Sequence, residues 1–299
     1  MNTSVALLNK EFGVDGEVTF RDAGDGFIII DIDNSHCSAS IAMQGAHLMS
    51  WTPKGEKPVI WMSPAATFTA GKSIRGGVPI CWPWFGAHAT QNTFPSHGFA
   101  RTSQWQVTAT DQLEDGCTRI SFSMVDGNSQ LWPLNTPVAV DMVIGHYLEI
   151  GLTTENLEDE SITLGSALHT YFTVSDASKI TIHGLDGCDY LDTVGSITRK
   201  KQQGDITIAE EVDRIYFDQG QDIVIEDPVL GREIRIEKQG SHSTIVWNPW
   251  IDKTLRMGDF GSDDGYLDMV CVESANASED IIELAAGDSH TLWVRYTLE

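Results

Sequence analysis

The sequence predicts an all-β protein, a sandwich or barrel built from many short strands. Two observations support this prediction. Apolar residues recur at every second position in eight short runs, which is the period of a half-buried strand. Pairs such as Asp-Gly, which favour turns, separate these runs. No segment after the first dozen residues has the period of a long amphipathic helix, so helices are not expected to form the core.

The predicted strands follow one another along much of the chain. Alternation is clearest at residues 120–124 and 148–152, where large apolar residues alternate with small or polar ones. The remaining runs, in chain order, lie at residues 180–182, 206–208, 234–236, 244–247, 269–273 and 291–296. The predicted turns are Asp115-Gly116, Asp126-Gly127, Gly184 to Gly187, Gly220 and Asp264-Gly265. Short strands separated by turns at this spacing are typical of antiparallel sheets packed face to face.

Length and composition indicate one large domain. The chain has 299 residues, 41% of them apolar, and contains no linker, repeat or low-complexity tract, so we predict a single domain over residues 1–299. No apolar run is long enough to span a bilayer, and residues 1–10 lack the pattern of a secretion signal. Five cysteines without a CxxC pair suit a reducing compartment. We therefore expect a cytoplasmic monomer, with oligomers left open.

The charge of the chain is strongly negative but unevenly distributed. Its net charge of −24 repels nucleic acid and anionic membranes, so neither is an expected partner. The favoured interpretation of this acidity is solubility or adaptation to a salty habitat. Residues 57–110, however, contain no acid at all, where the composition predicts roughly eight. Burial would explain the missing acids but not the retained Arg75 and Arg101, so we predict a site for a small anion.

Several common sites are absent from the sequence. It contains no GxxxxGK[ST], GxGxxG or GxSxG motif, which leaves phosphate loops, dinucleotide folds and serine-hydrolase elbows without support. None of the nine histidines forms an HxH or HExxH pair. We therefore predict no metal and no cofactor.

The segment from residue 71 to residue 99 is irregular and rich in Gly, Pro, Trp and His. A long irregular stretch inside a β domain is more often functional than idle. Arg75 precedes two glycines, which would let the backbone approach a ligand beside the guanidinium. Trp82 and Trp84 either offer flat faces to a sugar ring or pack in the core.

Three more segments contain candidate catalytic or ligand-binding residues. On a strand, His97 and Arg101 would share a face and point at one ligand; otherwise they form a surface pair. In extended structure His169 shares a face with Tyr171 and is either catalytic or a hydrogen-bonded core residue. Glu273 ends an apolar strand, where desolvation should raise its pKa toward neutrality, as a general base or acid requires, unless an arginine pairs with it.

Together these four segments resemble those of one family, the hexose-6-phosphate mutarotases (glucose-6-phosphate 1-epimerases) of the galactose-mutarotase-like superfamily. The resemblance runs from about residue 38 to residue 296 and rests on six motifs in order: GKSIRGGVPICWPWFG, HGFAR, LHTYF, DRIYF, WNPW and VCVESAN. It implies one β-supersandwich of large, mainly antiparallel sheets whose concave face holds the sugar. It also implies an isomerase that interconverts the α and β anomers of a hexose 6-phosphate, most readily glucose 6-phosphate.

The resemblance implies a catalytic set of three residues. His169 would be the general acid and Glu273 the general base of ring opening and closure, while His97 would assist at the ring oxygen and anomeric carbon. An acid and a base that flank one C–O bond suffice for this reaction, so neither a cofactor nor a metal is implied.

The resemblance implies a substrate-binding set as well. Arg75 and Arg101 would bind the phosphate, and Asp213 would hold sugar hydroxyls. Lys72 and Trp247 lie close to matched motifs and receive no role. A free-aldose mutarotase and a non-catalytic sugar-phosphate-binding protein are the alternatives. A glycoside hydrolase is a more distant one, because it would need a second carboxylate beside the bond.

Overall fold

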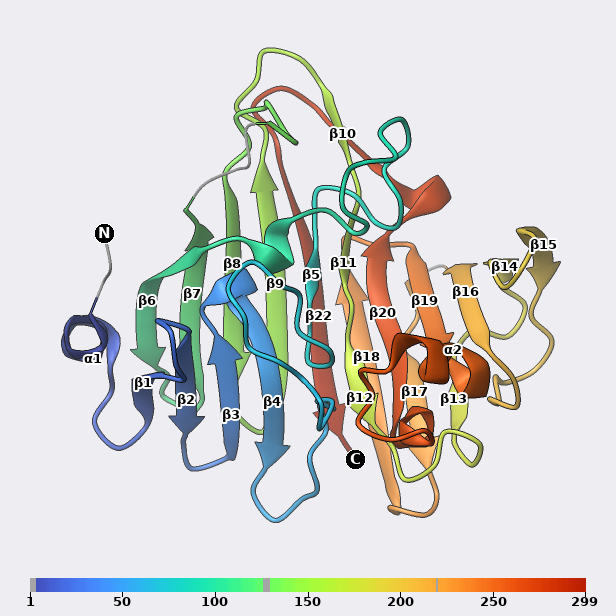
Figure 1. The fold of residues 1–299 in the computed structure, drawn as a ribbon, viewed down its shortest axis with the longest axis horizontal. Coiled ribbons are helices and arrows are strands. Elements are labelled where there is room, and N and C mark those ends of the chain that lie inside the picture. Colours follow the sequence, from blue (N-terminus) through green and yellow to red (C-terminus); the bar gives the residue numbers. More distant parts are fainter. Residues whose placement is uncertain (1–3, 126–129, 219) are drawn as a thin grey trace.

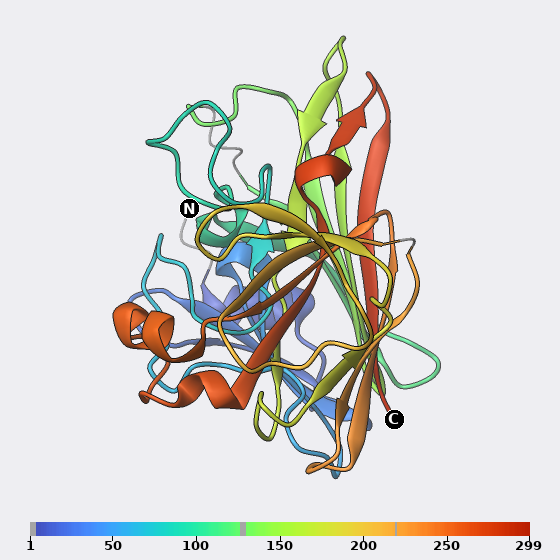
Figure 2. The ribbon, with the colours of Figure 1, turned by 90° about the vertical axis from the view of Figure 1, so that its right-hand side faces the viewer.

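The computed structural model describes residues 4–125, 130–218 and 220–299. Most regular structure within them is antiparallel β-sheet, which confirms the predicted all-β class. Two layers are visible in Figure 1. An eight-stranded sheet, here the long sheet, lies behind a four-stranded small sheet and a second eight-stranded sheet, here the cavity sheet. Figure 2 shows the layers from the side, with the long sheet at the right and helix α2 at the left.

The long sheet has the spatial order β13-β17-β18-β22-β9-β8-β7-β6. Its strands are β6 (Trp105–Gln112), β7 (Thr118–Met124), β8 (Val138–Ile144), β9 (Tyr147–Glu155), β13 (Thr181–His183), β17 (Ile223–Asp227), β18 (Arg232–Gln239) and β22 (Ser289–Leu298). Buried and less buried residues alternate along β18 and β22, because only one face of the sheet packs on the core.

The cavity sheet has the spatial order β15-β14-β16-β19-β20-β11-β5, and β12 also pairs with β20. Its strands are β5 (Ile80–Cys81), β11 (Ser166–Leu168), β12 (Tyr171–Thr173), β14 (Asp189–Asp192), β15 (Thr198–Lys201), β16 (Val212–Phe217), β19 (Ser243–Asn248) and β20 (Met269–Asn276). Every residue of β19 and β20 is buried, so both faces of these strands are covered. Val270 and Val272 join the main core, whereas Met269 and Cys271 join a second apolar cluster on the opposite face.

The small sheet is a simple meander that lies beside the cavity sheet. Its strands are β1 (Val18–Asp22), β2 (Ile28–Asp33), β3 (Cys37–Ala42) and β4 (His47–Pro53). Single bridges such as Leu48 to Val78 connect it to the segment that leads into β5. A separate two-stranded pair, β10 (Ile162–Leu164) with β21 (Ile282–Leu284), extends above the two layers in Figure 1.

Two short helices complete the described structure. Helix α1 (Val5–Phe12) packs on β1 and is capped by the Ser4 side chain, which accepts a hydrogen bond from the backbone N–H of Leu7. Helix α2 (Trp250–Met257) ends at Gly258 in the left-handed conformation and was not expected, because eight residues are too few for periodicity to identify. Four 3₁₀ turns are η1 (Gln44–Ala46), η2 (Ala100–Thr102), η3 (Gly265–Asp268) and η4 (Ser278–Asp280). In the described part of the chain, no helix has the length and apolar character needed to cross a bilayer.

Seven of the eight predicted strands are confirmed, as β7, β9, β13, β18, β19, β20 and β22. The prediction at residues 206–208 is wrong: Ile206 makes one bridge with Ile182 at the edge of the long sheet and forms no strand. The turn at Asp115-Gly116 connects β6 and β7 as expected. The turn predicted at Asp126-Gly127 lies outside the described residues.

Candidate active site

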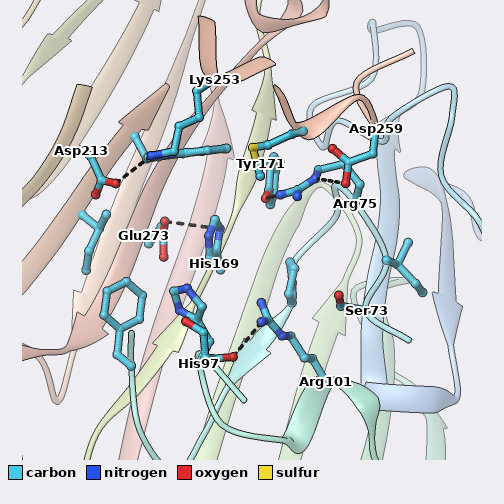
Figure 3. Close-up of a pocket in the computed structure, with 17 residues that line it drawn as sticks. Ser73, Arg75, His97, Arg101, His169, Tyr171, Asp213, Lys253, Asp259 and Glu273 are labelled. Atoms are coloured by element: carbon cyan, nitrogen blue, oxygen red, sulfur yellow. Dashed lines mark hydrogen bonds and ion pairs between the residues drawn. The ribbon is translucent and has the colours of Figure 1, made fainter. Parts of the chain in front are cut away.

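A cavity of about 330 Å³ opens on the face of the cavity sheet that carries the second apolar cluster. This volume lies within the range of about 300–1,000 Å³ typical of small-molecule sites. The residues that line it are Ser73, Ile74, Arg75, Pro79, Phe85, Ser96, His97, Arg101, His169, Tyr171, Asp213, Ile245, Trp247, Lys253, Met257, Asp259 and Glu273. In Figure 3 the two arginines lie on one side, Glu273 and Asp213 on the other, and the two histidines between them.

Glu273 is a carboxylate held in an apolar strand. Its side chain is 1% exposed, on the same face of β20 as Met269 and Cys271, which confirms the predicted orientation. Burial raises the pKa of Glu273 well above its ordinary value of 4.5, with a smaller contribution from the charge of Asp213, while Arg101 acts in the opposite direction. The expectation of a raised pKa is confirmed. Its Oε2 has no hydrogen-bond partner among the described residues.

His169 lies in the two-residue break between β11 and β12, and it shares the cavity face with Tyr171 as expected. Its backbone N–H donates to the carbonyl oxygen of Pro79 (3.0 Å), and its ring stacks on Tyr171 with 5.0 Å between centroids. Nδ1 of His169 lies 3.3 Å from Oε1 of Glu273. Burial lowers the pKa of His169 well below 6.5, and the charges of His97, Arg101 and Arg75 lower it further.

His97 projects into the cavity from a tight turn. Its φ of 65° and that of Gly98 (67°) are both left-handed, and a Cβ on Gly98 would lie 1.9 Å from the carbonyl oxygen of Trp82. Nδ1 of His97 accepts a hydrogen bond from the backbone N–H of Gly86 (3.3 Å), which leaves the proton of the neutral ring on Nε2. Burial, followed by the charges of Arg101 and Arg75, lowers the pKa of His97 to about 3, so the ring is neutral.

Arg75 is fixed by two neighbours on opposite parts of its guanidinium. Nε donates to Oδ2 of Asp259 (3.0 Å), and Nη1 donates to the hydroxyl of Tyr171 (2.7 Å). The guanidinium also lies over the ring of Phe260, 5.2 Å from its centroid. The side chain keeps 22% exposure, so part of the fork remains accessible from the cavity.

Arg101 lies in η2 and is less constrained. Its Nη2 donates to the backbone carbonyl of Ser96 (2.9 Å), and it forms no ion pair within the described residues. No strand forms here, since a turn holds His97 and a 3₁₀ helix holds Arg101. Both nevertheless line the cavity.

Asp213 lies on β16, opposite Trp247 of β19 in the sheet register. Its Oδ2 is 3.3 Å from Nζ of Lys253, which also lies 2.9 Å from Oε1 of Glu211. The lysine comes from α2 and extends over the Trp247 ring at 5.8 Å. Helix α2 therefore brings a cation to the acidic side of the cavity, away from the two arginines.

All six residues predicted for the site line this one cavity: Arg75, His97, Arg101, Asp213, His169 and Glu273. One accompanying interpretation, on the glycines, is wrong, and of the two alternatives for the tryptophans the structure supports core packing. The glycines after Arg75 allow close approach to protein backbone, since a Cβ on Gly76 would lie 2.6 Å from the Met62 Cα. Trp82 and Trp84 pack in the main core, and Phe85 and Trp247 line the cavity in their place.

Sequence reasoning missed several residues of the site. Tyr171 and Asp259 hold Arg75, and Lys253 pairs with Asp213. Tyr171 stands inside the LHTYF motif and could have been identified there. Lys253 and Asp259 lie in and just after a short helix without a distinguishing pattern, so only the three-dimensional structure reveals them.

Two cavity residues and the neighbouring Cys271 have side chains of the types that bind metals. Single ligand atoms of His169, Cys271 and Glu273 all lie within 4.8 Å of one another. Burial raises the pKa of the Cys271 thiol well above 9, and the nearby Glu273 adds to this shift, so the thiol keeps its proton. Beside this neutral thiol, the His169 imidazole and the Glu273 carboxyl face each other, an arrangement that suits acid–base chemistry.

Comparison with known proteins agrees with this geometry. Residues 29–297 match the family described as aldose 1-epimerase. A protein of Escherichia coli (strain K12) named "Putative glucose-6-phosphate 1-epimerase" is 38% identical over 85% of this chain and 85% of its own. A relative of the same name from Cenchrus ciliaris is 32% identical over 85% of this chain and 79% of its own.

Solved structures show the same architecture. A crystal structure described as that of "a putative mutarotase" from Salmonella typhimurium superposes with a TM-score of 0.88. Its sequence is 32% identical, and the match covers 96% of this chain and 95% of that one. A galactose mutarotase-like protein from Lactobacillus casei, at 17% identity, has a TM-score of 0.68 over 91% of this chain and 100% of its own. The expected galactose-mutarotase-like supersandwich is thereby confirmed, and the chain belongs to the aldose 1-epimerase family.

Proposed function

We propose that this protein interconverts the α and β anomers of a hexose 6-phosphate, with glucose 6-phosphate as the preferred substrate. The observation that carries the proposal is the buried pair of His169 and Glu273, 3.3 Å apart, in a cavity whose opposite side is formed by Arg75 and Arg101. The pair supplies an acid and a base at one point, and the arginines supply the positive charge that a phosphate ester requires.

Ring opening and closure need only proton transfers. The base removes the proton of the anomeric hydroxyl while the acid protonates the ring oxygen, so that the C1–O5 bond breaks and C1 becomes a carbonyl carbon. After rotation about C1–C2, the same two transfers run in reverse and close the ring on the other face. We assign the base to Glu273 and the acid to His169, each contributing on the order of 10²–10⁴-fold.

The phosphate itself helps to prepare the acid. Burial disfavours the charge on both Glu273 and His169, so the pair retains one proton between carboxyl and imidazole. The positive charges of Arg101 and Arg75 are among the causes that lower the pKa of His169. A phosphate dianion between these arginines would offset that field, which raises the pKa of His169 and favours the imidazolium–carboxylate form needed for turnover.

His97 and Asp213 complete the proposed site. With Nδ1 occupied by the Gly86 N–H, the neutral His97 ring presents Nε2–H as a donor, which suits a hydrogen bond to the ring oxygen or O1. Asp213 lies on the side of the cavity away from the arginines, where it would accept hydrogen bonds from sugar hydroxyls. Lys253 would hold the Asp213 carboxylate in place, in a positioning role.

The remaining features of the proposal concern the whole protein. We propose a single domain over residues 1–299 that acts as a monomer on a small-molecule sugar phosphate and needs neither metal nor cofactor. A cytoplasmic location is supported by the five cysteines, which are all free thiols. Light scattering during gel filtration gives the molar mass in solution and so tests whether the protein is a monomer.

The direct test is NMR exchange spectroscopy on equilibrated glucose 6-phosphate, with and without the protein and with free glucose as second substrate. Faster exchange between α and β signals for the phosphate ester, abolished in Glu273→Gln, is the expected result. Equal acceleration of free glucose would favour the free-aldose mutarotase. Tight binding of the ester without faster exchange would favour the non-catalytic binding protein.

A further inference from the structure

Three hairpin turns meet at one edge of the two layers, at the lower side of Figure 1. They connect β2 to β3, β6 to β7 and β8 to β9, so they come from both the small sheet and the long sheet. Each turn contributes one side chain of a type that binds transition metals, namely His36, Cys117 and His146. A ligand atom from each of the three lies within 4.8 Å of the other two. None of the three lines the cavity described above.

The distances within this cluster suit a tetrahedral ion. Sγ of Cys117 lies 3.6 Å from Nδ1 of His146. In a tetrahedral zinc site, with Zn–S near 2.3 Å and Zn–N near 2.05 Å, sulfur and nitrogen ligands stand about 3.6 Å apart. The rings of His36 and His146 meet edge to face with 5.0 Å between centroids, and one nitrogen of each ring lies within 4.8 Å of the sulfur.

The turns that carry the three ligands are held in place by other contacts. The side-chain amide of Asn34 donates to Oγ1 of Thr118 (3.0 Å) and to the carbonyl oxygen of Ile144 (2.9 Å), which ties the three turns together. Nε2 of His36 lies 2.8 Å from the carbonyl oxygen of Asp115, which orients the ring. A Cβ at Gly145 would lie 2.2 Å from the sulfur of Cys117, so only glycine leaves room for that sulfur.

We propose that His36, Cys117 and His146 form a binding site for a divalent transition-metal ion of the zinc class. Two imidazoles and a thiolate are the donors that such borderline ions prefer. The fourth position would be taken by water or by the carboxylate of Asp115 on the same turn as Cys117. Binding releases the thiol proton to solvent, with no change of oxidation state. The ion would join the small sheet to the long sheet and stabilise the fold, independently of the catalytic cavity.

Titration of the metal-free full-length protein with Co²⁺ tests the site, because a thiolate-to-cobalt charge-transfer band reports the sulfur ligand directly. The wild type should show this band together with tetrahedral ligand-field bands, and Zn²⁺ should displace the cobalt. His146→Ala should weaken Co²⁺ binding by at least about 100-fold, the upper end of what loss of an outer-shell partner costs. Cys117→Ser should abolish the charge-transfer band. His146 is exposed, so its variant should fold even if the buried Cys117 tolerates no change.

Cys271→Ser is the matched control, because Cys271 is the cysteine that lies near His169 and Glu273, away from the proposed metal site. The band should persist in this variant. A band that disappears in Cys271→Ser and survives in Cys117→Ser would overturn the proposal, as would a wild type without any thiolate band. As an independent measure, Zn²⁺ should raise the Tm of the wild type and leave that of His146→Ala unchanged.

Discussion

Nδ1 of His169 lies 3.3 Å from Oε1 of Glu273, and neither residue has a lysine or arginine as an ion-pair partner among the described residues. Glu273 reaches this position from β20, and His169 reaches it from the break between β11 and β12. Strand β11 pairs with β20, with Ala167 opposite Ala275, which fixes the spacing between the two side chains. Burial raises the pKa of Glu273 and lowers that of His169, so it favours a neutral carboxyl beside a neutral imidazole. Such a pair can donate at one atom and accept at another without changing its own net charge.

The His169–Glu273 pair should behave as a unit in kinetics. Glu273→Gln and His169→Asn should each lower kcat on glucose 6-phosphate by on the order of 10²–10⁴-fold. The double variant should lose little more than the worse single variant, because each partner is idle without the other. NMR line shapes give the rate of exchange between the anomers for all three proteins. Losses that multiply in the double variant would show that the two residues act in separate steps.

Arg75 and Arg101 should discriminate between phosphorylated and free sugar. Arg101→Ala should lower kcat/KM for glucose 6-phosphate by about 10–100-fold, as expected for loss of a hydrogen bond between charged groups. Arg75→Ala should do the same, and turnover of free glucose should change little in both variants. Arg119→Ala, which removes an exposed arginine from β7, is the matched control and should leave both substrates unaffected. Equal losses on both sugars would contradict the phosphate anchor.

His47 should make the fold sensitive to acid. Its ring is fully buried, with Nε2 2.9 Å from the carbonyl oxygen of Gly76, and burial lowers its pKa to about 4. Since the unfolded chain binds a proton near pH 6.5 and the folded chain does not, stability is lost as the pH falls from 6.5 toward 4. At pH 5 the loss from this one residue should be about 2 kcal/mol relative to pH 7.5.

The variant His47→Gln isolates this contribution, because a glutamine amide can still donate to Gly76 and does not titrate. The other buried histidines remain in both proteins, so their effects cancel in the comparison. Urea unfolding at pH 7.5 and pH 5 should show a smaller drop in unfolding free energy for the variant, by about 2 kcal/mol. An identical drop in both proteins would mean that His47 protonates without cost in the folded state.

Gly98 should be intolerant of any side chain. Gly98→Ala should destabilise the protein through its left-handed φ, about 1 kcal/mol, and through a clash with the Trp82 carbonyl of about 1–3 kcal/mol more. Gly204→Ala is the matched control: its φ is 69° and nothing lies within 4 Å of the added Cβ. Denaturant unfolding of both variants separates the two contributions. Gly98→Ala should also lower kcat, because the same turn positions His97. Equal destabilisation of the two variants would exclude the clash.

Much of the fold could be predicted because strand signals are local. Alternation over five residues is enough to identify β7 or β9, and the apolar run before Glu273 predicts both the strand and the face on which the carboxylate lies. The strand predicted at Ile206 failed because alternation does not reveal how far a segment runs beside its neighbour, and Ile206 meets β13 at a single bridge to Ile182. Helix α2 was missed because a helix of two turns is defined by its packing more than by its sequence.

The members of the site could be predicted from their motifs, whereas their electrostatics could not. Arg75 and Asp259 are 184 residues apart in the sequence, and nothing local in either segment indicates that they pair. The pKa of a buried carboxyl depends on how completely water is excluded and on which charges remain nearby, and both result from packing between distant segments.

The sequence by itself determined the all-β class, several strands of the two large sheets, and the six residues that meet in the cavity. Hydrophobic period, turn residues and motifs can be identified from residues that are close together in the chain. Only the tertiary structure decided that His97 projects from a turn and Arg101 from a 3₁₀ helix. It also decided that Lys253 reaches Asp213 from α2 and that His36, Cys117 and His146 lie close together. These relationships join segments far apart in the chain, and their energies depend on distance and burial, which exist only once the sheets have packed.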